Sequence, residues 1–164
     1  MGNMETTRTT RISSNGKLKL TAFQLGYIVG FLEGEGSFIL FKNKGRYTSR
    51  IATSQKDPKP LLYVQKLIGG YIRYEPRKGS EKSPTYHHDI FDQQTIKKII
   101  QVIYPYLISP RTRKRAWCVY RMATLKNKTG GKIILSKENL AERKRVYKIW
   151  ETSRRPKKGT SRGK

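Results

Sequence analysis

Four short stretches of the chain are rich in β-branched and aromatic residues, and apolar residues recur every three or four positions in the stretches around them. A period of two indicates strands and a period near 3.6 indicates helices. The stretch 37–42 favours a strand, and 47–55 alternates with a period of two. A polar turn joins these two stretches and another joins 71–77 to 85–91, so each pair is expected to form an antiparallel hairpin. The pattern predicts an α+β domain with the order αββαββα.

Side chains that can accept a hydrogen bond from a first helical turn mark the starts of the three helices in this order. Thr21 and Gln24 form a capping box, which places the first helix at about 22–34. Asp57 and Asp92 precede the second and third helices. These caps agree with the hydrophobic periodicity, so the helix starts are predicted from two independent features.

The C-terminal third of the chain predicts two more helices, one over about 111–128 and one that follows a Ser136 cap. The ends of the chain lack periodicity and are rich in basic and small polar residues. We therefore expect one folded domain at 20–153, between a flexible basic arm at 1–19 and a basic disordered tail at 154–164.

The charge balance narrows the class of partner. The chain has 36 Lys+Arg against 11 Asp+Glu, a net charge of +25. Such an excess on a folded domain indicates a polyanionic partner, above all nucleic acid. The sequence has no apolar run long enough to span a membrane. Its single cysteine, Cys118, cannot form an internal disulfide.

The first helix carries Gly26, Gly30 and Gly34 at every fourth position, which places them on one face. Each glycine costs a helix about 1 kcal/mol relative to alanine. Small residues at this spacing let two helices approach backbone to backbone. Two interpretations follow from spacing alone. The helix is either an ordinary amphipathic helix ending in two solvated glutamates, or half of a close-packed pair whose terminal acids, Glu33 and Glu35, lie at a metal site.

The stretch 29–37, Val-Gly-Phe-Leu-Glu-Gly-Glu-Gly-Ser, resembles the signature of the LAGLIDADG homing endonucleases. It differs in having Val29 where the signature has Ala, and Glu where Asp is frequent. The order αββαββα over about 20–125 is similar to that of the family, whose fold has an antiparallel β-saddle, here with additional C-terminal helices. One copy of the motif implies a homodimer of the single-motif type.

The resemblance implies which residues meet across the dimer and which bind metal. The implied dimer interface is formed by Gly26, Val29, Gly30 and Glu33. Glu35, with the backbone carbonyl of Gly34, is the implied ligand of Mg²⁺, as one of two or three divalent ions shared across the dimer. Mn²⁺ or Ca²⁺ can substitute in binding.

Further catalytic residues are implied at positions that match the family. Gln55 is expected to order solvent near the attacking water, and Lys59 falls where a basic residue is frequent. Either Arg113 or Lys114 occupies the place of an active-site lysine that stabilises the transition state. Each of these cations can also be read as a solvated charge that faces DNA.

The hairpins are expected to supply the DNA contacts, because a β-ribbon fits the major groove. Basic, aromatic and small polar side chains of the hairpins are the candidates: Ser37, Lys42, Lys44, Arg46, Tyr47, Arg50, Arg73, Tyr74, Arg77, Lys78 and Tyr86. His87 and His88 are adjacent on a strand and face opposite ways, so they cannot ligate one metal ion.

The function that the resemblance implies is a site-specific, Mg²⁺-dependent endonuclease that cuts both strands of double-stranded DNA at a long pseudo-palindromic target. One alternative is an intron maturase that binds RNA on the same fold. Another is a basic ribosomal-type binder in which the glycine helix serves packing only. Family habit adds the expectation of an intron-encoded protein in an organelle, a chloroplast or a mitochondrion.

Overall fold

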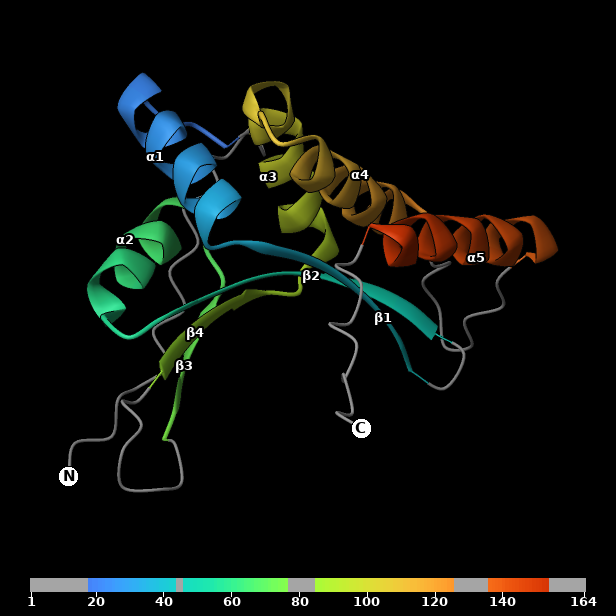
Figure 1. Ribbon diagram of the computed structural model, residues 1–164, viewed down its shortest axis with the longest axis horizontal. Helices are drawn as coiled ribbons and strands as arrows, with labels where there is room; N and C mark the ends of the chain where they lie inside the picture. Colours follow the sequence, from blue (N-terminus) through green and yellow to red (C-terminus); the bar gives the residue numbers. More distant parts are fainter. Residues whose placement is uncertain (1–17, 44–45, 77–84, 126–135, 154–164) are drawn as a thin grey trace, which may run out of the picture.

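The structure is a computed structural model that describes residues 18–43, 46–76, 85–125 and 136–153 (Figure 1). Its elements, in chain order, are α1 (Ala22–Gly34), β1 (Ser37–Asn43), β2 (Arg46–Gln55), α2 (Pro58–Ile68), β3 (Tyr71–Glu75), β4 (Thr85–Ile90), α3 (Gln93–Ile103), the 3₁₀ turn η1 (Tyr104–Tyr106), α4 (Pro110–Thr124) and α5 (Lys137–Thr152). The predicted α+β class and the order αββαββα are confirmed. The expected tail, and the expected arm apart from Leu18 and Lys19, lie outside the described residues.

The four strands form one antiparallel sheet in the order β1-β2-β4-β3. The two hairpins therefore join through β2 and β4, which occupy the centre. The helices lie on one side of this arched sheet, and no described helix covers the other side (Figure 1). We call that second side the open face. Among the described helices, none is long and apolar enough to cross a membrane.

Alternation along the strands divides their side chains between the helices and the open face. Phe38 and Leu40 of β1 and Ile51 of β2 are each 1% exposed and pack beneath the helices. Their sequence neighbours, such as Ile39 and Arg50, point to the open face and are only partly buried. In β1 both faces carry apolar residues, and it is the burial of Phe38 and Leu40 that distinguishes the helical side.

The core between the sheet and the helices is dominated by isoleucine. Ile96, Ile99, Ile100 and Ile103 recur along one side of α3, and each is at most 1% exposed. α5 is joined to the same core through Trp150, whose Nε1 donates to the Phe38 carbonyl at 2.8 Å. The sheet and all the helical layers thus share one core.

A buried arginine joins α5 to two further segments, β2 and the end of α4. Arg143 of α5 is 2% exposed and donates to the Tyr47 carbonyl at 3.2 Å, to Asn139 Oδ1 at 2.9 Å and to the Leu125 carbonyl. Burial lowers the pKa of this guanidinium. Oxygen acceptors on β2, α5 and the end of α4 surround it, as a buried cation requires.

The helix caps follow the sequence rules closely. Thr21 and Gln24 form both hydrogen bonds of the capping box, and Asp57, Asp92 and Ser136 cap α2, α3 and α5. The fourth helix differs from its prediction: it begins at Pro110 after a Ser109 cap and ends at Thr124. Proline fits the first helical position because its missing N–H has no intrahelical acceptor there.

Candidate functional site

The two glutamates at the foot of α1 have different surroundings. The Glu33 carboxylate accepts hydrogen bonds from the backbone N–H groups of Ile108 and Ser109, both at 2.9 Å. It therefore fastens α1 to the segment where α4 begins. This use within the chain limits what Glu33 can offer to the dimer interface predicted for it.

Glu35 caps α1 and is exposed to solvent. Its backbone N–H donates to the Phe31 carbonyl at 2.9 Å, which fixes the residue's place. Within the described residues its carboxylate has no hydrogen bond or ion pair. The next residue must be glycine, because a Cβ on Gly36 would lie 2.3 Å from the Leu32 carbonyl oxygen. The turn from α1 into β1 thus holds a free carboxylate on a fixed backbone.

The donor set at this turn fits a hard divalent cation. Carboxylate and backbone carbonyl oxygens are the protein ligands of Mg²⁺, which usually keeps several waters and uses one or two carboxylates with substrate phosphates. The described residues contain no cluster of three or more His, Cys, Asp or Glu that could hold a metal. Glu35 and the Gly34 carbonyl therefore suit a site that a second chain, water or phosphate completes.

The glycines of α1 face outward. A Cβ added at Gly26, Gly30 or Gly34 would meet no described residue within 4 Å. Phe23 lies on the same side and is 74% exposed. Nothing in the described part of the chain therefore requires small residues here. Val29 does not fit its prediction as an interface residue, because it is 9% exposed and belongs to the hydrophobic core.

Gln55 and Lys59 lie on either side of the short connection from β2 to α2. Gln55 is the last residue of β2 and is half-buried opposite Tyr86 of β4. Lys59 is in the first turn of α2, with an exposed side chain and a backbone N–H that donates to Asp57 Oδ1 at 2.9 Å. Neither side chain hydrogen-bonds to Glu35 among the described residues.

The two candidate cations of α4 point to different neighbours. Arg113 donates to the Leu107 carbonyl at 3.2 Å and lies over the Tyr104 ring, 5.1 Å from its centroid. Lys114 Nζ donates to Thr152 Oγ1 at 3.3 Å. Arg113 is thus held against η1 and Lys114 against the end of α5, and neither is joined to Glu35 by an interaction among the described residues.

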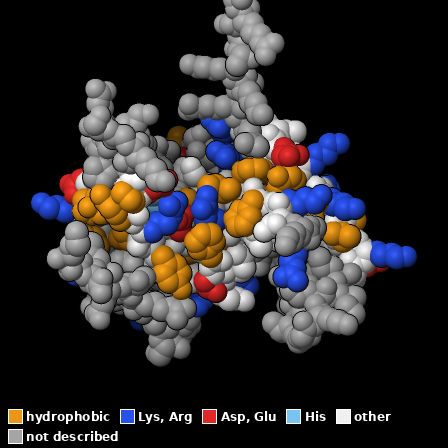
Figure 2. Space-filling model, turned by 90° about the horizontal axis from the view of Figure 1, so that it is seen from below, with side chains coloured by type: hydrophobic (Ala, Val, Ile, Leu, Met, Phe, Trp, Pro, Cys, Tyr) orange, Lys and Arg blue, Asp and Glu red, His pale blue; other side chains and the backbone are white. Residues whose placement is uncertain are grey.

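The predicted DNA contacts divide by strand face. Ser37, Arg46, Arg50 and Arg73 belong to the alternate positions that point to the open face. Lys42, Tyr47, Tyr74 and Tyr86 belong to the other set, on the helical side of the sheet. Lys44, Arg77 and Lys78 lie outside the described residues. Figure 2 shows the open face, where Lys and Arg side chains are interspersed with hydrophobic and acidic ones.

The burial of Tyr47 speaks against its predicted contact with DNA. Tyr47 is 7% exposed, and its ring packs on Tyr147 of α5 at a centroid distance of 5.4 Å. Lys42 lies against the same ring, with Nζ 5.7 Å from the Tyr47 ring centroid. Tyr47 shares its strand face with Ile51, so the phase of the alternation indicates a buried tyrosine.

Tyr74 and Tyr86 are paired with each other on that same side of the sheet, at its β3–β4 edge. They are cross-strand neighbours with ring centroids 5.3 Å apart. Each of the two rings therefore packs against the other. Tyr74 nonetheless keeps 52% of its surface exposed, so its side chain can still contact a partner.

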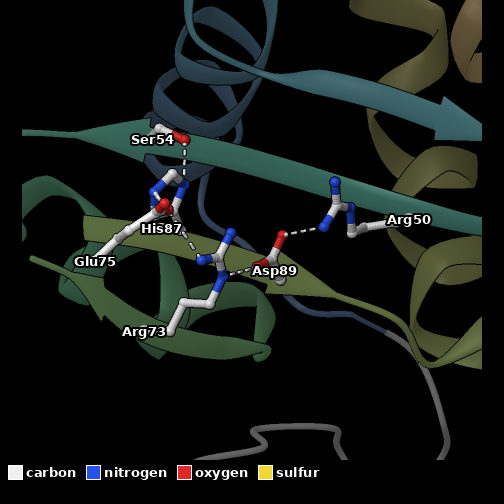
Figure 3. A network of polar contacts seen from close by, with 6 residues as sticks. All are labelled: Arg50, Ser54, Arg73, Glu75, His87 and Asp89. Carbon is white, nitrogen blue, oxygen red and sulfur yellow. Dashed lines mark hydrogen bonds and ion pairs between the residues drawn. The ribbon is translucent and has the colours of Figure 1, made fainter. Parts of the chain in front are cut away.

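A network of polar side chains crosses the open face over three strands (Figure 3). At its centre, Asp89 of β4 is 3% exposed and accepts from Arg73 Nε at 3.1 Å. Its other oxygen lies 3.4 Å from Arg50 Nη1. The bond to Asp89 is the main reason that the pKa of Arg73 is raised. Sequence reasoning missed Asp89, because its neighbours depend on the strand order.

The network continues along β4, the strand that carries both histidines. His87 Nε2 lies 2.8 Å from Glu75 Oε2, and its Nδ1 lies 2.7 Å from Ser54 Oγ. Arg73 Nη1 also donates to Glu75 at 3.2 Å. His88 points the opposite way, as predicted, and its Nε2 donates to the Gly69 carbonyl at 2.6 Å. Burial lowers the pKa of His88.

The family model described as "LAGLIDADG endonuclease" matches residues 28–116, which is more than half of the 164-residue chain. This chain belongs to the LAGLIDADG endonuclease family. The match includes the turn with Glu35 and extends to the first part of α4. A comparison with curated protein sequences gives no match.

Solved structures of LAGLIDADG homing endonucleases share the fold. The group I intron-encoded homing endonuclease I-CeuI, complexed with DNA, has a TM-score of 0.60 and 18% identity, covering 88% of this chain and 72% of that one. The homing endonuclease I-CvuI, in complex with its target in the presence of Ca, has a TM-score of 0.60 and 17% identity, with 84% and 86% covered. The archaeal intron-encoded homing endonuclease I-Vdi141I, complexed with DNA, has a TM-score of 0.57 and 19% identity, and the match covers 87% of this chain and 89% of that one.

Proposed function

We propose that this LAGLIDADG protein is a site-specific homing endonuclease that hydrolyses both strands of double-stranded DNA as a homodimer with divalent metal. The observation that carries the proposal is the Glu35 carboxylate, held free of other described side chains at the end of a helix whose outer face is bare glycine. The DNA complexes named for the structural neighbours support DNA as the substrate.

The outer face of α1 supports the dimer. Its glycines leave the helix backbone uncovered, and α1 carries apolar residues on the outer side as well as the inner one. A helix that is apolar all round is normally buried on all sides. A second copy of α1, related by a two-fold axis, would cover this face and bring the two Glu35 residues to the same place.

Each part of the chain then has a task in the reaction. The two Glu35 carboxylates and the Gly34 carbonyls would hold Mg²⁺, with Mn²⁺ or Ca²⁺ as possible replacements in binding. When bound, the metal supplies a nucleophilic water and stabilises charge on the phosphate. Gln55 orients solvent, and a cation from Lys59, Arg113 or Lys114 faces the scissile phosphate. The open face of the sheet contacts the duplex.

The net charge supports a nucleic-acid partner of either kind. An intron maturase would use the same basic surfaces on structured RNA and would not need Glu35. The free carboxylate favours the nuclease, because an exposed acid beside a polyanion is unfavourable unless a cation lies between them.

We expect Glu35→Gln to abolish cleavage and leave DNA binding nearly unchanged, because it removes a metal ligand and no groove contact. Purified protein is incubated with genomic DNA of the source, with and without Mg²⁺, and the fragment ends are sequenced. The matched control is Glu151→Gln, which removes an exposed acid from α5. Binding is measured in Ca²⁺ on the fragments that the wild type selects.

Discrete double-strand ends that need Mg²⁺ and appear for the wild type and Glu151→Gln, but not for Glu35→Gln, support the nuclease. Cleavage by Glu35→Gln would refute the site. Absence of cleavage by every form, together with tight binding of intron RNA that Glu35→Gln leaves unchanged, would replace the nuclease with the maturase.

A further inference from the structure

Asp89 is an acid at the centre of a surface that, by the function proposed above, faces a polyanion. It lies on β4, opposite Ala52 of β2 and Tyr71 of β3, so its side chain shares the open face with both neighbouring strands. Its residue exposure of 3% leaves almost nothing for a base or phosphate to touch. A role for Asp89 in DNA binding must therefore act through its neighbours.

Its neighbours are two arginines on diagonal positions of the flanking strands. Arg50 approaches from β2 and Arg73 from β3, with N···O separations of 3.4 Å and 3.1 Å (Figure 3). Each guanidinium has a second support. Arg50 lies 5.7 Å from the centroid of the Phe91 ring, and Arg73 donates to Glu75 at 3.2 Å. The side chains of Arg50 and Arg73 nevertheless keep 28% and 53% of their surface exposed.

The network is balanced in formal charge when His87 is counted as neutral. Arg50 and Arg73 supply two positive charges, and Asp89 and Glu75 supply two negative ones. This balance occurs in a protein with a net charge of +25. A cation that is already compensated attracts a phosphate less strongly, whereas base edges in the major groove present both donors and acceptors. A balanced patch is therefore better suited to base edges than to phosphates.

We propose that Asp89 is a positioning residue for sequence discrimination. It holds Arg50 and Arg73 in fixed orientations on the open face, ready to donate to base edges, and it offsets their attraction to phosphate. A guanidinium held in place beforehand loses less freedom on binding and can engage a guanine bidentately. This inference rests on the proposed function, because it assumes that the open face contacts DNA.

Stability alone is a weak reason for this arrangement. Ion pairs between partly buried groups contribute little to folding, since desolvation offsets their attraction. The raised pKa of Arg73 reflects a bond that stabilises its charged form but does not require that form to face solvent. The exposed parts of both arginines point to a function outside the folded chain.

Asp89→Asn tests this role, since it keeps the shape of the side chain and removes its charge. We expect the variant to bind random-sequence DNA more tightly, with a slope of log K against log salt that is steeper by about 1. Discrimination at the base pairs read by the two arginines should fall by about tenfold or more. A residue that served stability alone would not change discrimination at a confined group of base pairs.

Glu142→Gln is the matched control. Glu142 also lies between two arginines, 3.3 Å from Arg121 and 3.7 Å from Arg145, but on the helical side of the sheet. The Glu142→Gln substitution changes the net charge by the same amount as Asp89→Asn. The control should shift the salt dependence less and leave discrimination unchanged. Arg73→Lys is the second variant, because it keeps the charge and loses the bidentate geometry.

The probe is a pool of duplex DNA with a randomised central segment, bound in Ca²⁺ and sequenced after selection, with a thermal melt of each protein. If the wild type enriches no sequence, the proposed function fails. If the wild type enriches a site and Asp89→Asn discriminates equally well, the inference is overturned. If Asp89→Asn does not fold, Arg73→Lys decides: it must lose discrimination at a confined group of base pairs, and an unchanged profile overturns the inference.

Discussion

At the scale of single residues, two adjacent histidines show how alternation separates tasks on one strand. His87 joins the polar network of the open face, whereas His88 is 1% exposed and bonds to the Gly69 carbonyl. Gly70 lies against the same ring, because a Cβ there would be 2.5 Å from His88 Nε2. His88 therefore fastens the end of α2 to β4, and its ring leaves no space for a side chain at position 70.

The burial of His88 predicts a pH dependence of stability. Its folded pKa is below the ordinary value of about 6.5, so the unfolded chain binds more protons in acid. Stability from this residue is therefore fully present above about pH 6.5 and falls as the pH drops from there towards the lowered folded pKa.

His88→Gln should weaken that dependence, because the amide can still donate to the Gly69 carbonyl and cannot titrate. We expect a cost of about 1 kcal/mol at pH 7 from imperfect geometry, and a smaller loss than in the wild type between about pH 7 and 5. Urea unfolding at both pH values measures the difference. Equal losses in the two proteins would show that His88 is not responsible.

At the scale of elements, the sequence predicted what local rules govern. The caps at Thr21, Asp57 and Asp92 and both hairpins follow from short-range hydrogen bonding and alternation, and the structure has them. The start of α4 was placed one residue late because Ser109 was not recognised as its cap. These features need only neighbours a few residues apart.

Contacts between residues that lie far apart in the sequence could not be predicted from such local rules. The strand order β1-β2-β4-β3 brings Asp89 between Arg50 and Arg73, and no local pattern gives that order. The expectation that Tyr47 contacts DNA is weak for a different reason. It gave more weight to the aromatic character of Tyr47 than to its position on the same strand face as the buried Ile51. The candidate metal residue Glu35 was identified from the motif, and its catalytic role stays a prediction.

The bare face of α1 gives a prediction about assembly that separates dimerisation from folding. Gly30→Leu should dissociate the proposed homodimer, because the new side chain would stand between the two helices. Among the residues that the structure describes, a Cβ at Gly30 would meet nothing within 4 Å. Leucine also favours a helix by roughly 0.8 kcal/mol over glycine, so the monomer should be at least as stable.

Sedimentation equilibrium distinguishes the two states, and thermal unfolding checks the fold. Lys144→Leu on α5 is the control, since it places the same side chain on an exposed helix position elsewhere. The wild type and the control should be dimeric, and Gly30→Leu monomeric and folded. A dimeric Gly30→Leu would mean that the glycine face is not the interface.

At the scale of the whole molecule, the fold separates one helical side from one open face, and the net charge of +25 does not say which of them binds DNA. The sheet supplies an extended surface from both hairpins, and the central network on it is balanced in charge. Arg46 lies at the start of β2, exposed and in the alternation that points to the open face. It is a candidate for a phosphate contact beyond that network.

Arg46→Gln should therefore weaken binding to every duplex by a similar factor and reduce the salt slope by about 1, because one phosphate contact releases about one counterion. The sequence preference should stay the same, in contrast to the change expected for Asp89→Asn. Lys148→Gln on α5 removes an equal charge from the helical side and should alter the slope much less. Salt titrations of the three proteins on one selected and one random duplex measure both quantities. A larger change for Lys148→Gln than for Arg46→Gln would place the duplex on the helical side, and the assignment of the open face to DNA would have to be abandoned.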